Sequence, residues 1–597
     1  MAAQLLEHRL ATLEAARDQF GPKAGARALR LLRALDGARF PHPFSLIRFH
    51  EVLLFLRAFP QSVTVLRAVE RILNHFHKKV DALQQSGADM TAFDTFEYSG
   101  ISGTTMEDTL SFDIARWLVR RMPGQVEIAW DNYEPGRELG TTGPRFMPLL
   151  EDDAYVEADT PWRRWLEAAA GEARGKRDKA ASRTPAWLLG RFENSPLPDA
   201  QKAELYESLR IPLRWSLGNS PLSRTHNWKP VRKIFYHDAP LISRSQVSLA
   251  HELARRPPSF TRLSLRAGAA IVEMIREVML VRYRELYGTT LADPRSVVRA
   301  DHGDDKSSND EAGRGVTIYL WSLPPARRLP LRAYVAGLTL KNGVPINYIE
   351  AIGLCEWMEV GFNTFYTFRG GEAGWIYAQV LRSLCAYMGT TVVSVYPYQI
   401  GHDNEEAIES GAFWFYRKLG FRPGRAELLD LVRREEEKIA ADDTTEGGKK
   451  YRTPARTLRR LAAGHIFYDL PGAEVGAWNR FSTRNIGLRV NQRMARDFGG
   501  DSDRMRRHAS RGLERRLGVS TSQWTSLERA AFDNFALVLA QVPGLSVWTR
   551  QEKEDLVRVI RAKSKRDEMF YLHLTQRHGR LRRALLTVGS LDERWKD

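Results

Sequence analysis

The chain has 597 residues, of which 43% are hydrophobic and 27% charged, a balance that excludes a disordered or low-complexity protein and predicts several globular domains. Its formal net charge of +17 favours acidic partners such as nucleic acid, anionic lipid or a phosphate-rich cofactor. No segment approaches the roughly 20 apolar residues of a membrane span, and no secretory signal pattern is present, so we expect no membrane contact and a cytoplasmic location.

The first half of the chain predicts two successive regions. Residues 1–86 have apolar positions at spacings of three and four, interrupted by glycine and proline, which predicts a helical N-terminal region. Residues 87–300 are mixed but mostly helical, with a strand expected at 126–130 and an amphipathic helix at 263–287. The polar, basic stretch 172–182 indicates either a linker or a solvated helix face.

The spacing of apolar residues changes from helical to alternating in the next region, residues 301–424. A charged loop of small residues at 301–315 precedes segments in which apolar and polar residues alternate. Lys341-Asn342-Gly343 has the composition of a tight hairpin turn. The expected elements are strands at 316–321, 331–340, 345–355 and 356–368, a helix at 373–388, a strand at 391–400 and a helix at 404–419.

The rest of the chain predicts a charged hinge at 425–450 and a basic helical C-terminal domain at 451–597. From residue 491 onward, 22 lysines and arginines stand against 14 acidic residues. Several of the arginines recur four positions apart and would share a helix face; the run is Arg504, Arg506, Arg507, Arg511, Arg515 and Arg516. Such a run is usually a solvated surface, and it is also what contact with a phosphate backbone requires. No base-reading motif accompanies it.

A glycine-rich turn between an expected strand and an expected helix predicts a phosphate seat. The first N–H groups of a helix have no intrahelical acceptor, the helix dipole favours negative charge there, and glycine lets a ligand approach the backbone closely. The turn comprises Phe368, Arg369, Gly370, Gly371, Glu372, Ala373 and Gly374, in which Arg369 adds a cation. A lone glycine cluster is more often a plain connection, so this interpretation depends on its neighbours.

Two motifs at this separation resemble one family. Residues 403–423, DNEEAIESGAFWFYRKLGFRP, resemble the closing motif of the GNAT N-acetyltransferase superfamily, and FRGGEAG at 368–374 resembles that family's acetyl-CoA pyrophosphate loop. The resemblance covers residues 316–424 only. It implies an α/β (α+β) fold with a central mixed, mostly antiparallel sheet, flanked here by largely helical regions. It also implies that the pantetheine arm inserts between splayed fourth and fifth strands.

The resemblance implies roles for individual residues. Tyr416 corresponds to the general acid that protonates the departing thiolate of coenzyme A, and Asn404 to the asparagine that contacts the pantetheine or phosphate region. A phenol suits the first role, because its reference pKa is about 10 and that of a thiol about 8.5. The alternative for Tyr416 is an ordinary core aromatic. Two positions depart from the family pattern: Phe368 replaces the usual Gln or Arg, and Glu372 places a carboxylate beside the phosphates.

The attacking amine has to lose a proton, and the nearest candidate bases are Glu356 and Glu359 on the strand before the turn. Their odd separation places them on opposite sheet faces, so at most one faces the cleft. Glu356 is the preferred candidate; the alternative is that both are solvated strand residues. Backbone N–H groups around Gly361 and Phe362 are expected to polarise the thioester carbonyl.

These features predict an enzyme that moves an acetyl or related acyl group from coenzyme A directly to an amine acceptor in a ternary complex, without a metal. No covalent intermediate is expected, because neither Cys355 nor Cys385 has an evident histidine partner. The alternative is a non-catalytic binding protein on a degenerate GNAT scaffold. In that case the basic C-terminal region would contact nucleic acid or an acidic partner.

Overall fold

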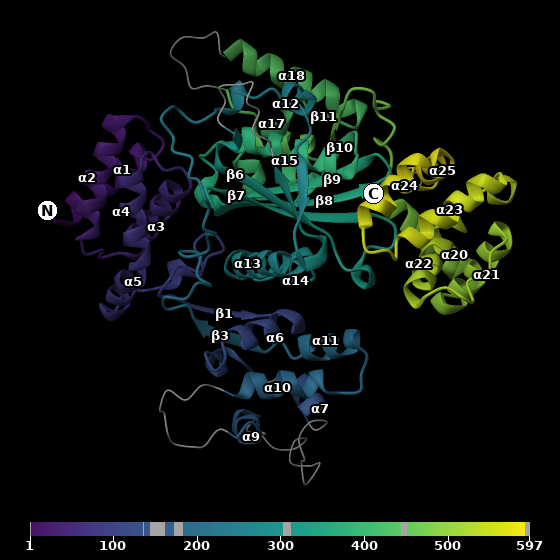
Figure 1. The fold of residues 1–597 in the computed structure, drawn as a ribbon, viewed down its shortest axis with the longest axis horizontal. Coiled ribbons are helices and arrows are strands. Elements are labelled where there is room, and N and C mark those ends of the chain that lie inside the picture. Colours follow the sequence, from purple (N-terminus) through teal and green to yellow (C-terminus); the bar gives the residue numbers. More distant parts are fainter. Residues whose placement is uncertain are drawn as a thin grey trace. The chain divides into compact units, whose positions relative to one another are not determined.

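A computed structural model describes residues 2–134, 137–143, 162–171, 183–301, 312–442 and 451–590 (Figure 1). The chain divides into two compact units. Unit 1 comprises Met1–Pro240, Ala270–Thr290 and Lys341–Pro345, and unit 2 comprises Leu241–Ala269, Leu291–Leu340 and Ile346–Asp597. The stretch 172–182 and most of the loop 301–315 lie outside the described residues.

The N-terminal part of unit 1 is a group of helices, drawn in purple in Figure 1. They are α1 (Ala2–Ala16), α2 (Pro22–Asp36), α3 (Pro43–Ala58), α4 (Val63–Asn74) and α5 (Phe76–Gln85). Prolines stand at the first position of α2 and α3, where their missing N–H costs nothing. α3 is buried along almost its whole length and packs against α1, α4 and α5. The helices expected over residues 1–86 are therefore present.

A three-stranded antiparallel sheet forms the second part of unit 1, in the order β1-β3-β2. Its elements are β1 (Thr105–Thr109), α6 (Phe112–Arg121), β2 (Val126–Ile128), α7 (Arg137–Thr142), α9 (Trp162–Ala169), α10 (Thr184–Glu193), α11 (Asp199–Ser208), β3 (Pro212–Ser216) and α14 (Tyr287–Thr290). The core contains the fully buried Phe192 and Trp215. Of the three strands, only β2 is expected from the sequence; β1 is mostly polar, and β3 begins at a proline.

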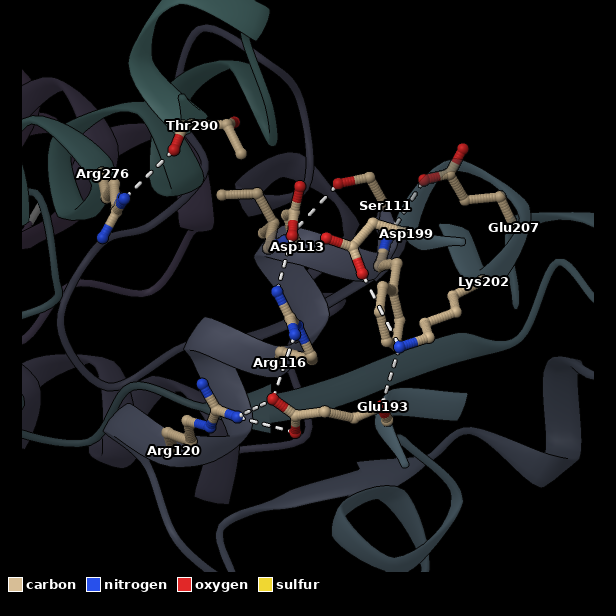
Figure 2. A network of polar contacts seen from close by, with 12 residues as sticks. Ser111, Asp113, Arg116, Arg120, Glu193, Asp199, Lys202, Glu207, Arg276 and Thr290 are labelled. Carbon is tan, nitrogen blue, oxygen red and sulfur yellow. Dashed lines mark hydrogen bonds and ion pairs between the residues drawn. The ribbon is translucent and has the colours of Figure 1, made fainter. Parts of the chain in front are cut away.

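A polar network joins three helices of unit 1 (Figure 2). The carboxylate of Glu193, at the end of α10, accepts hydrogen bonds from Arg116 and Arg120 of α6 at 3.1 and 2.6 Å. The Glu193 carbonyl accepts a hydrogen bond from Lys202 of α11 at 3.0 Å. Because these side chains are partly exposed, each ion pair contributes at most about 1 kcal/mol. The network therefore orients the helices, while the buried core stabilises them.

Unit 2 is built on a nine-stranded mixed sheet, in the order β11-β12-β10-β9-β8-β7-β6-β5-β4. The strands are β4 (Ser259–Arg262), β5 (Val298–Asp301), β6 (Val316–Trp321), β7 (Ala333–Lys341), β8 (Val344–Leu354), β9 (Trp357–Thr364), β10 (Val392–Val395), β11 (Arg422–Pro423) and β12 (Ile466–Asp469). β9 and β10 run parallel, whereas β8–β9, β10–β12 and β4–β5–β6 are antiparallel. The expected mixed α/β class with a largely antiparallel sheet is confirmed.

The turn between β7 and β8 forms where the sequence predicts it. Asn342 and Gly343 occupy its two central positions with φ angles of 48° and 82°. Asparagine and glycine are the residues that tolerate this left-handed region. Gly343 cannot be replaced without strain, because a Cβ there would lie 2.0 Å from the carbonyl oxygen of Lys229.

Helices complete unit 2. They are α12 (Leu249–Ala254), α15 (Ala373–Met388), α16 (Glu405–Glu409), α17 (Ala412–Arg417), α18 (Ala426–Asp442), α19 (Ala455–Leu461), α20 (Thr483–Phe498), α21 (Ser502–Leu517), α22 (Ser526–Leu539), α23 (Arg550–Ala562), α24 (Glu568–Arg577) and α25 (Gly579–Gly589). The further helix α13 (Leu265–Tyr283) contains the boundary between the units. α15 covers the sheet face that carries Phe362, whose ring contacts Tyr377.

Several elements differ from the sequence prediction. The expected strand at 356–368 ends at Thr364, and the expected strand at 391–400 ends at Val395. The expected helix at 404–419 breaks at Gly411, which has a φ of 66°, into α16 and α17. Most of the expected hinge at 425–450 is the helix α18, and residues 443–450 lie outside the described residues.

Domain limits differ as well. β4 and β5 fall in the region 87–300, yet both belong to the sheet of unit 2, so the predicted boundary near residue 301 cuts through that sheet. β12 adds a strand to it from the C-terminal region expected to be helical. None of the helices in the described part of the chain combines the length and the apolar run that a bilayer crossing requires.

Candidate functional site

The parallel strands β9 and β10 pair over only part of their length. The last register pair joins Glu359 to Ser394. β10 ends at Val395, whereas β9 continues to Thr364. A 3-10 turn, η9 (Pro397–Ile400), follows β10, and its proline has no N–H to extend the ladder. The two strands therefore part beyond Glu359.

A cavity of about 330 Å³ lies at this parting. It is bounded by the end of β9, the start of α15, the turn η9 and the helices α16 and α17. Its lining is Phe362, Asn363, Thr364, Arg369, Ala373, Tyr398, Gln399, Asn404, Glu406, Ala407, Ser410, Ala412, Phe415 and Tyr416. We call it the Tyr416 cavity. It brings together Arg369, Ala373, Asn404 and Tyr416, which the sequence singles out from two separate motifs.

The start of α15 offers backbone donors to this cavity. Among the described residues, no acceptor meets the N–H of Ala373 or of Gly374. Ala373 lines the cavity, so its N–H is the donor best placed for an anion. Gly371 instead donates its N–H to the carbonyl of Phe368 at 2.9 Å, and Phe368 is buried. Fewer backbone N–H groups are therefore available to bind a phosphate than the sequence predicts.

Two of the glycines have roles other than the expected contact with phosphate. Gly374 is buried, and a Cβ there would lie 3.1 Å from Cγ of Arg244. Its missing side chain lets the segment around η4 (Arg244–Gln246) pack against α15. Gly370 is exposed and lies outside the lining of the Tyr416 cavity.

Glu372 does not face the Tyr416 cavity, which corrects the expectation that its carboxylate lies beside bound phosphates. It is fully buried, pairs with Arg314 at 2.5 Å and accepts a hydrogen bond from the N–H of Ile242 at 3.2 Å. A buried carboxylate needs such partners, because an isolated one carries a large desolvation cost. Glu372 is thus neutralised within the protein and does not oppose an anion at Ala373.

Arg369 stands at the mouth of the Tyr416 cavity. Its guanidinium lies over the ring of Tyr366, 5.3 Å from the centroid, and forms an ion pair with Glu406. Both partners of this pair are exposed and both line the cavity. The pair is therefore weak and open to exchange for another anion.

Asn404 is held by the protein at both ends of its amide. Oδ1 accepts the N–H of Ala407 at 3.2 Å as the N-cap of α16, and Nδ2 donates to the carbonyl of Tyr398 at 3.0 Å. Asparagine suits this position, because a short polar side chain satisfies a free helix N–H. Asn404 thus fixes α16 against the turn η9 and shapes the cavity wall.

Gln399 fills the gap between the parted strands. Its Oε1 accepts the backbone N–H of Phe362 at 3.2 Å and the phenol of Tyr416 at 3.3 Å. Gly361 makes room for it, because a Cβ at Gly361 would lie 2.8 Å from Nε2 of Gln399. The N–H expected to polarise a carbonyl therefore points into the gap, where an amide oxygen accepts it.

Tyr416 is a buried aromatic that lines the cavity and donates its hydroxyl hydrogen to Gln399. Its ring packs edge-on against Tyr377 and Phe421, with centroids 5.5 and 5.8 Å away. Burial raises the pKa of Tyr416 above its usual value, because the phenolate would be poorly solvated. The phenol is therefore a neutral donor at physiological pH. Both sequence interpretations of Tyr416, core aromatic and proton donor, are compatible with this placement.

Neither candidate base lines the Tyr416 cavity. Glu356 lies in the turn before β9, where it accepts a hydrogen bond from Trp478 at 2.7 Å and pairs with Arg582 at 2.6 Å. This is the end of β9 remote from Phe362, so the preference for Glu356 is not supported. Glu359 lies beside the parting and accepts a hydrogen bond from Nε2 of His465 at 2.8 Å.

The arginine run of the C-terminal region lies on α21. A shallow hollow on this helix is lined by Arg504, Arg507, His508, Arg511, Glu514 and Arg515. Among the described residues, no carboxylate lies within ion-pair distance of Arg507 or Arg511. An exposed cationic face is therefore formed by Arg504, Arg507, Arg511 and Arg515, whereas Arg506 and Arg516 of the run are half-buried.

No protein-family model, curated protein or solved structure matches the chain. Sequence reasoning missed Gln399, Glu406 and His465. The unusually long connection YPYQIGHDN after β10 is the signal that could have revealed Gln399, because a longer connection can return a side chain into the gap.

Proposed function

We propose that unit 2 is an acyl-CoA-dependent N-acyltransferase whose acyl donor occupies the Tyr416 cavity. One observation supports the proposal. The two motifs at 368–374 and 403–423 both contribute residues to one cavity, which lies where the parallel strands β9 and β10 part. This is the arrangement that the resemblance to the GNAT superfamily implies. The cavity volume of about 330 Å³ is at the low end for small-molecule sites, which suits an acyl-pantetheine arm with the nucleotide outside.

In the proposed reaction an amine nitrogen bonds to the acyl carbon while the carbon–sulfur bond breaks. Tyr416 donates its proton to the departing sulfur. The N–H of Phe362 donates to the acyl oxygen, on which negative charge develops. The proton lost by the amine passes to Glu359 or to its partner His465, the pair that lies beside the parting. Arg369 and the N–H of Ala373 hold the diphosphate.

Gln399 has to move for this reaction to occur. Its amide oxygen lies between the two donors, Phe362 and Tyr416, that the proposal assigns to the thioester. An acyl carbonyl can accept from the same N–H, so the exchange leaves no buried donor unsatisfied. The carboxamide of Gln399 thus stands in for the ligand's carbonyl when no ligand is bound.

The test is calorimetric titration of the full chain with acetyl-CoA. We expect Arg369→Gln to weaken binding about tenfold, because a charge-assisted contact to phosphate is lost. We expect Glu406→Gln to strengthen binding several-fold, because it releases Arg369 and removes a negative charge from the cavity mouth.

Opposite effects of these two variants are the specific signature. Arg433→Gln on α18, an exposed arginine outside the cavity, is the matched control and should leave the Kd unchanged. No heat of binding to the wild-type chain at millimolar acetyl-CoA would remove the enzyme proposal.

A second candidate function is contact with nucleic acid through α21. Four arginines of α21, none of them in an ion pair within the described part of the chain, share the hollow described above. Arginines that neutralise phosphates release the counterions condensed on a nucleic acid, which favours binding. This surface does not depend on the Tyr416 cavity, so the two functions are separable.

Titration of the full chain with a labelled DNA duplex at several salt concentrations tests this candidate. Arg507→Gln combined with Arg511→Gln should lower the slope of log K against log salt by about two, one for each lost phosphate contact. Arg550→Gln on α23 is the control, because Arg550 is exposed and already paired with Glu554. An unchanged slope in the double variant would exclude α21 as the binding face.

A further inference from the structure

A second cavity, of about 470 Å³, adjoins the parting of β9 and β10. Trp357 and Glu359 of β9 line it, together with His465, Arg332, Arg425 and Arg484. We call it the Glu359 cavity. It is not lined by any residue of the Tyr416 cavity.

The two cavities lie on opposite faces of β9. Side chains alternate along a strand, so Trp357 and Glu359 point to one face and Phe362 to the other. The packing agrees: Trp357 stacks on Trp478 at 5.2 Å, whereas Phe362 contacts Tyr377 of α15 at 4.8 Å. Gly361 has no side chain to separate the faces, and Gln399 lies against it. Once Gln399 leaves the gap, an acceptor in the Glu359 cavity would approach the acyl group from the far face.

The charge of the Glu359 cavity is positive. Three arginines line it against one carboxylate, Glu359, and that carboxylate is already engaged by His465 at 2.8 Å and Arg332 at 3.7 Å. Among the described residues, Arg425 has no carboxylate within ion-pair distance. Burial lowers the pKa of Arg332, because desolvation disfavours its charged form. An anion bound in the cavity would stabilise the charged guanidinium of Arg332 and so offset this desolvation.

The N-terminus of helix α20 adds to the positive charge of the Glu359 cavity. Ser482, Thr483 and Arg484 line the cavity at the N-terminus of α20, which has no acidic residue in its first turn. The Ser482 hydroxyl caps the helix by accepting the N–H of Arg484 at 3.2 Å. The helix dipole therefore favours a negative group here, in the same cavity as the arginines.

We propose that the acceptor is a small primary amine that carries a carboxylate or phosphate group, and that Arg425 and Arg332 of the Glu359 cavity bind this anionic group. The inference rests on the proposed acyl transfer and names its substrate class. The cavity volume fits a small molecule rather than a polymer. With its anion on the arginines, the amine end lies near Glu359 and His465.

The first test compares matched amines as acceptors, with release of free coenzyme A thiol as the readout. Glycine is paired with glycinamide, and phosphoethanolamine with ethanolamine, so that one arm reports on carboxylate and the other on phosphate. We expect the anionic member of at least one pair to have the higher kcat/KM. Neutral amines that react as well as both anionic partners, in a chain that binds acetyl-CoA, would overturn the inference while leaving the proposed function intact.

The second test removes the exposed cation. Arg425→Gln should raise KM for the anionic amine about tenfold, because a charge-assisted hydrogen bond is lost, with the Kd for acetyl-CoA unchanged. Arg425→Lys should restore part of the loss, and Arg433→Gln should have no effect. Arg425 is exposed and has no ion-pair partner within the described part of the chain, so these variants should fold. A KM for the anionic amine that is the same in Arg425→Gln and wild type would refute the assignment.

A binding measurement keeps the inference testable if acetyl-CoA does not bind. Inorganic phosphate should raise the midpoint of thermal unfolding of the wild-type chain through mass action. This increase should be smaller in Arg425→Gln than in Arg433→Gln. Equal increases in the two variants would mean that phosphate binds elsewhere, and the anion site would be rejected independently of the proposed enzyme activity.

Discussion

Replacing Tyr416 by phenylalanine is expected to lower kcat for acyl transfer by about two to four orders of magnitude, the usual contribution of a positioned general acid. The ring should keep its place, because its edge-on contacts with Tyr377 and Phe421 do not involve the hydroxyl. The Kd for acetyl-CoA should therefore change little. Steady-state kinetics on this variant measures kcat, and calorimetry on the same variant measures the Kd for acetyl-CoA.

The pH profile gives this prediction a second readout. Burial raises the pKa of Tyr416, so the phenol keeps its proton through the neutral range and up to at least pH 10, the usual value being about 10. Loss of activity between pH 8 and about 9 would have to come from another group. An alkaline decline in this range that is present in the wild type and absent in Tyr416→Phe would mean that Tyr416 itself loses its proton there, which would contradict its raised pKa.

Tyr377→Phe is the matched control for Tyr416→Phe. Tyr377 is fully buried in the same aromatic group, and its hydroxyl has no hydrogen-bond partner within the described part of the chain. Removing that hydroxyl should leave kcat unchanged. Equal losses in the two variants would indicate that the aromatic packing, and not the proton of Tyr416, is what the reaction needs.

The parts of the site that follow from local sequence were predictable. α15 spans the residues that its apolar spacing predicts, since that signal lies within the helix itself. The hairpin turn at Asn342 and Gly343 was predictable for the same reason, because its signal consists of the turn residues themselves. Ala373 and Tyr416 belong to two motifs that the sequence predicts to form one site, and both line the Tyr416 cavity.

The parts that depend on distant residues were not predictable. Glu372 is neutralised by Arg314 and by the N–H of Ile242, which are remote in sequence and carry no motif. β12 adopts strand geometry only because β10 and β11 offer it a place between them. A four-residue strand among helices has no periodic signal of its own.

The same distinction explains why the carboxylates were misjudged. The odd spacing of Glu356 and Glu359 predicts that at most one of them faces the cleft, but Glu356 lies in the turn before β9, where strand alternation does not apply. The spacing alone cannot say which glutamate faces the cleft, because that depends on the side chains that bind each carboxylate. Arg582 binds Glu356 at one end of the strand, and His465 binds Glu359 beside the parting. Both partners come from the C-terminal region, more than a hundred residues away in the chain.

Ala373→Asp should produce opposite effects on stability and on binding. Ala373 is the first residue of α15, a helix without an acidic residue in its first turn. A carboxylate there interacts favourably with the helix dipole, so stability to thermal unfolding should stay the same or rise by up to about 1 kcal/mol. The same carboxylate would occupy the anion seat, where a diphosphate meets like charge at a cost of several kcal/mol. Acetyl-CoA binding should then fall at least about a hundredfold.

The neutral variant Ala373→Asn separates charge from size. It adds a side chain of the same shape without the negative charge, so its binding loss should be much smaller than that of Ala373→Asp. Raising the salt concentration should narrow the difference between the two variants, because exposed charges are screened. If Asp and Asn weakened acetyl-CoA binding equally, the loss would be steric. The N–H groups at the start of α15 would then not be where the diphosphate binds, whatever Tyr416 contributes to the reaction.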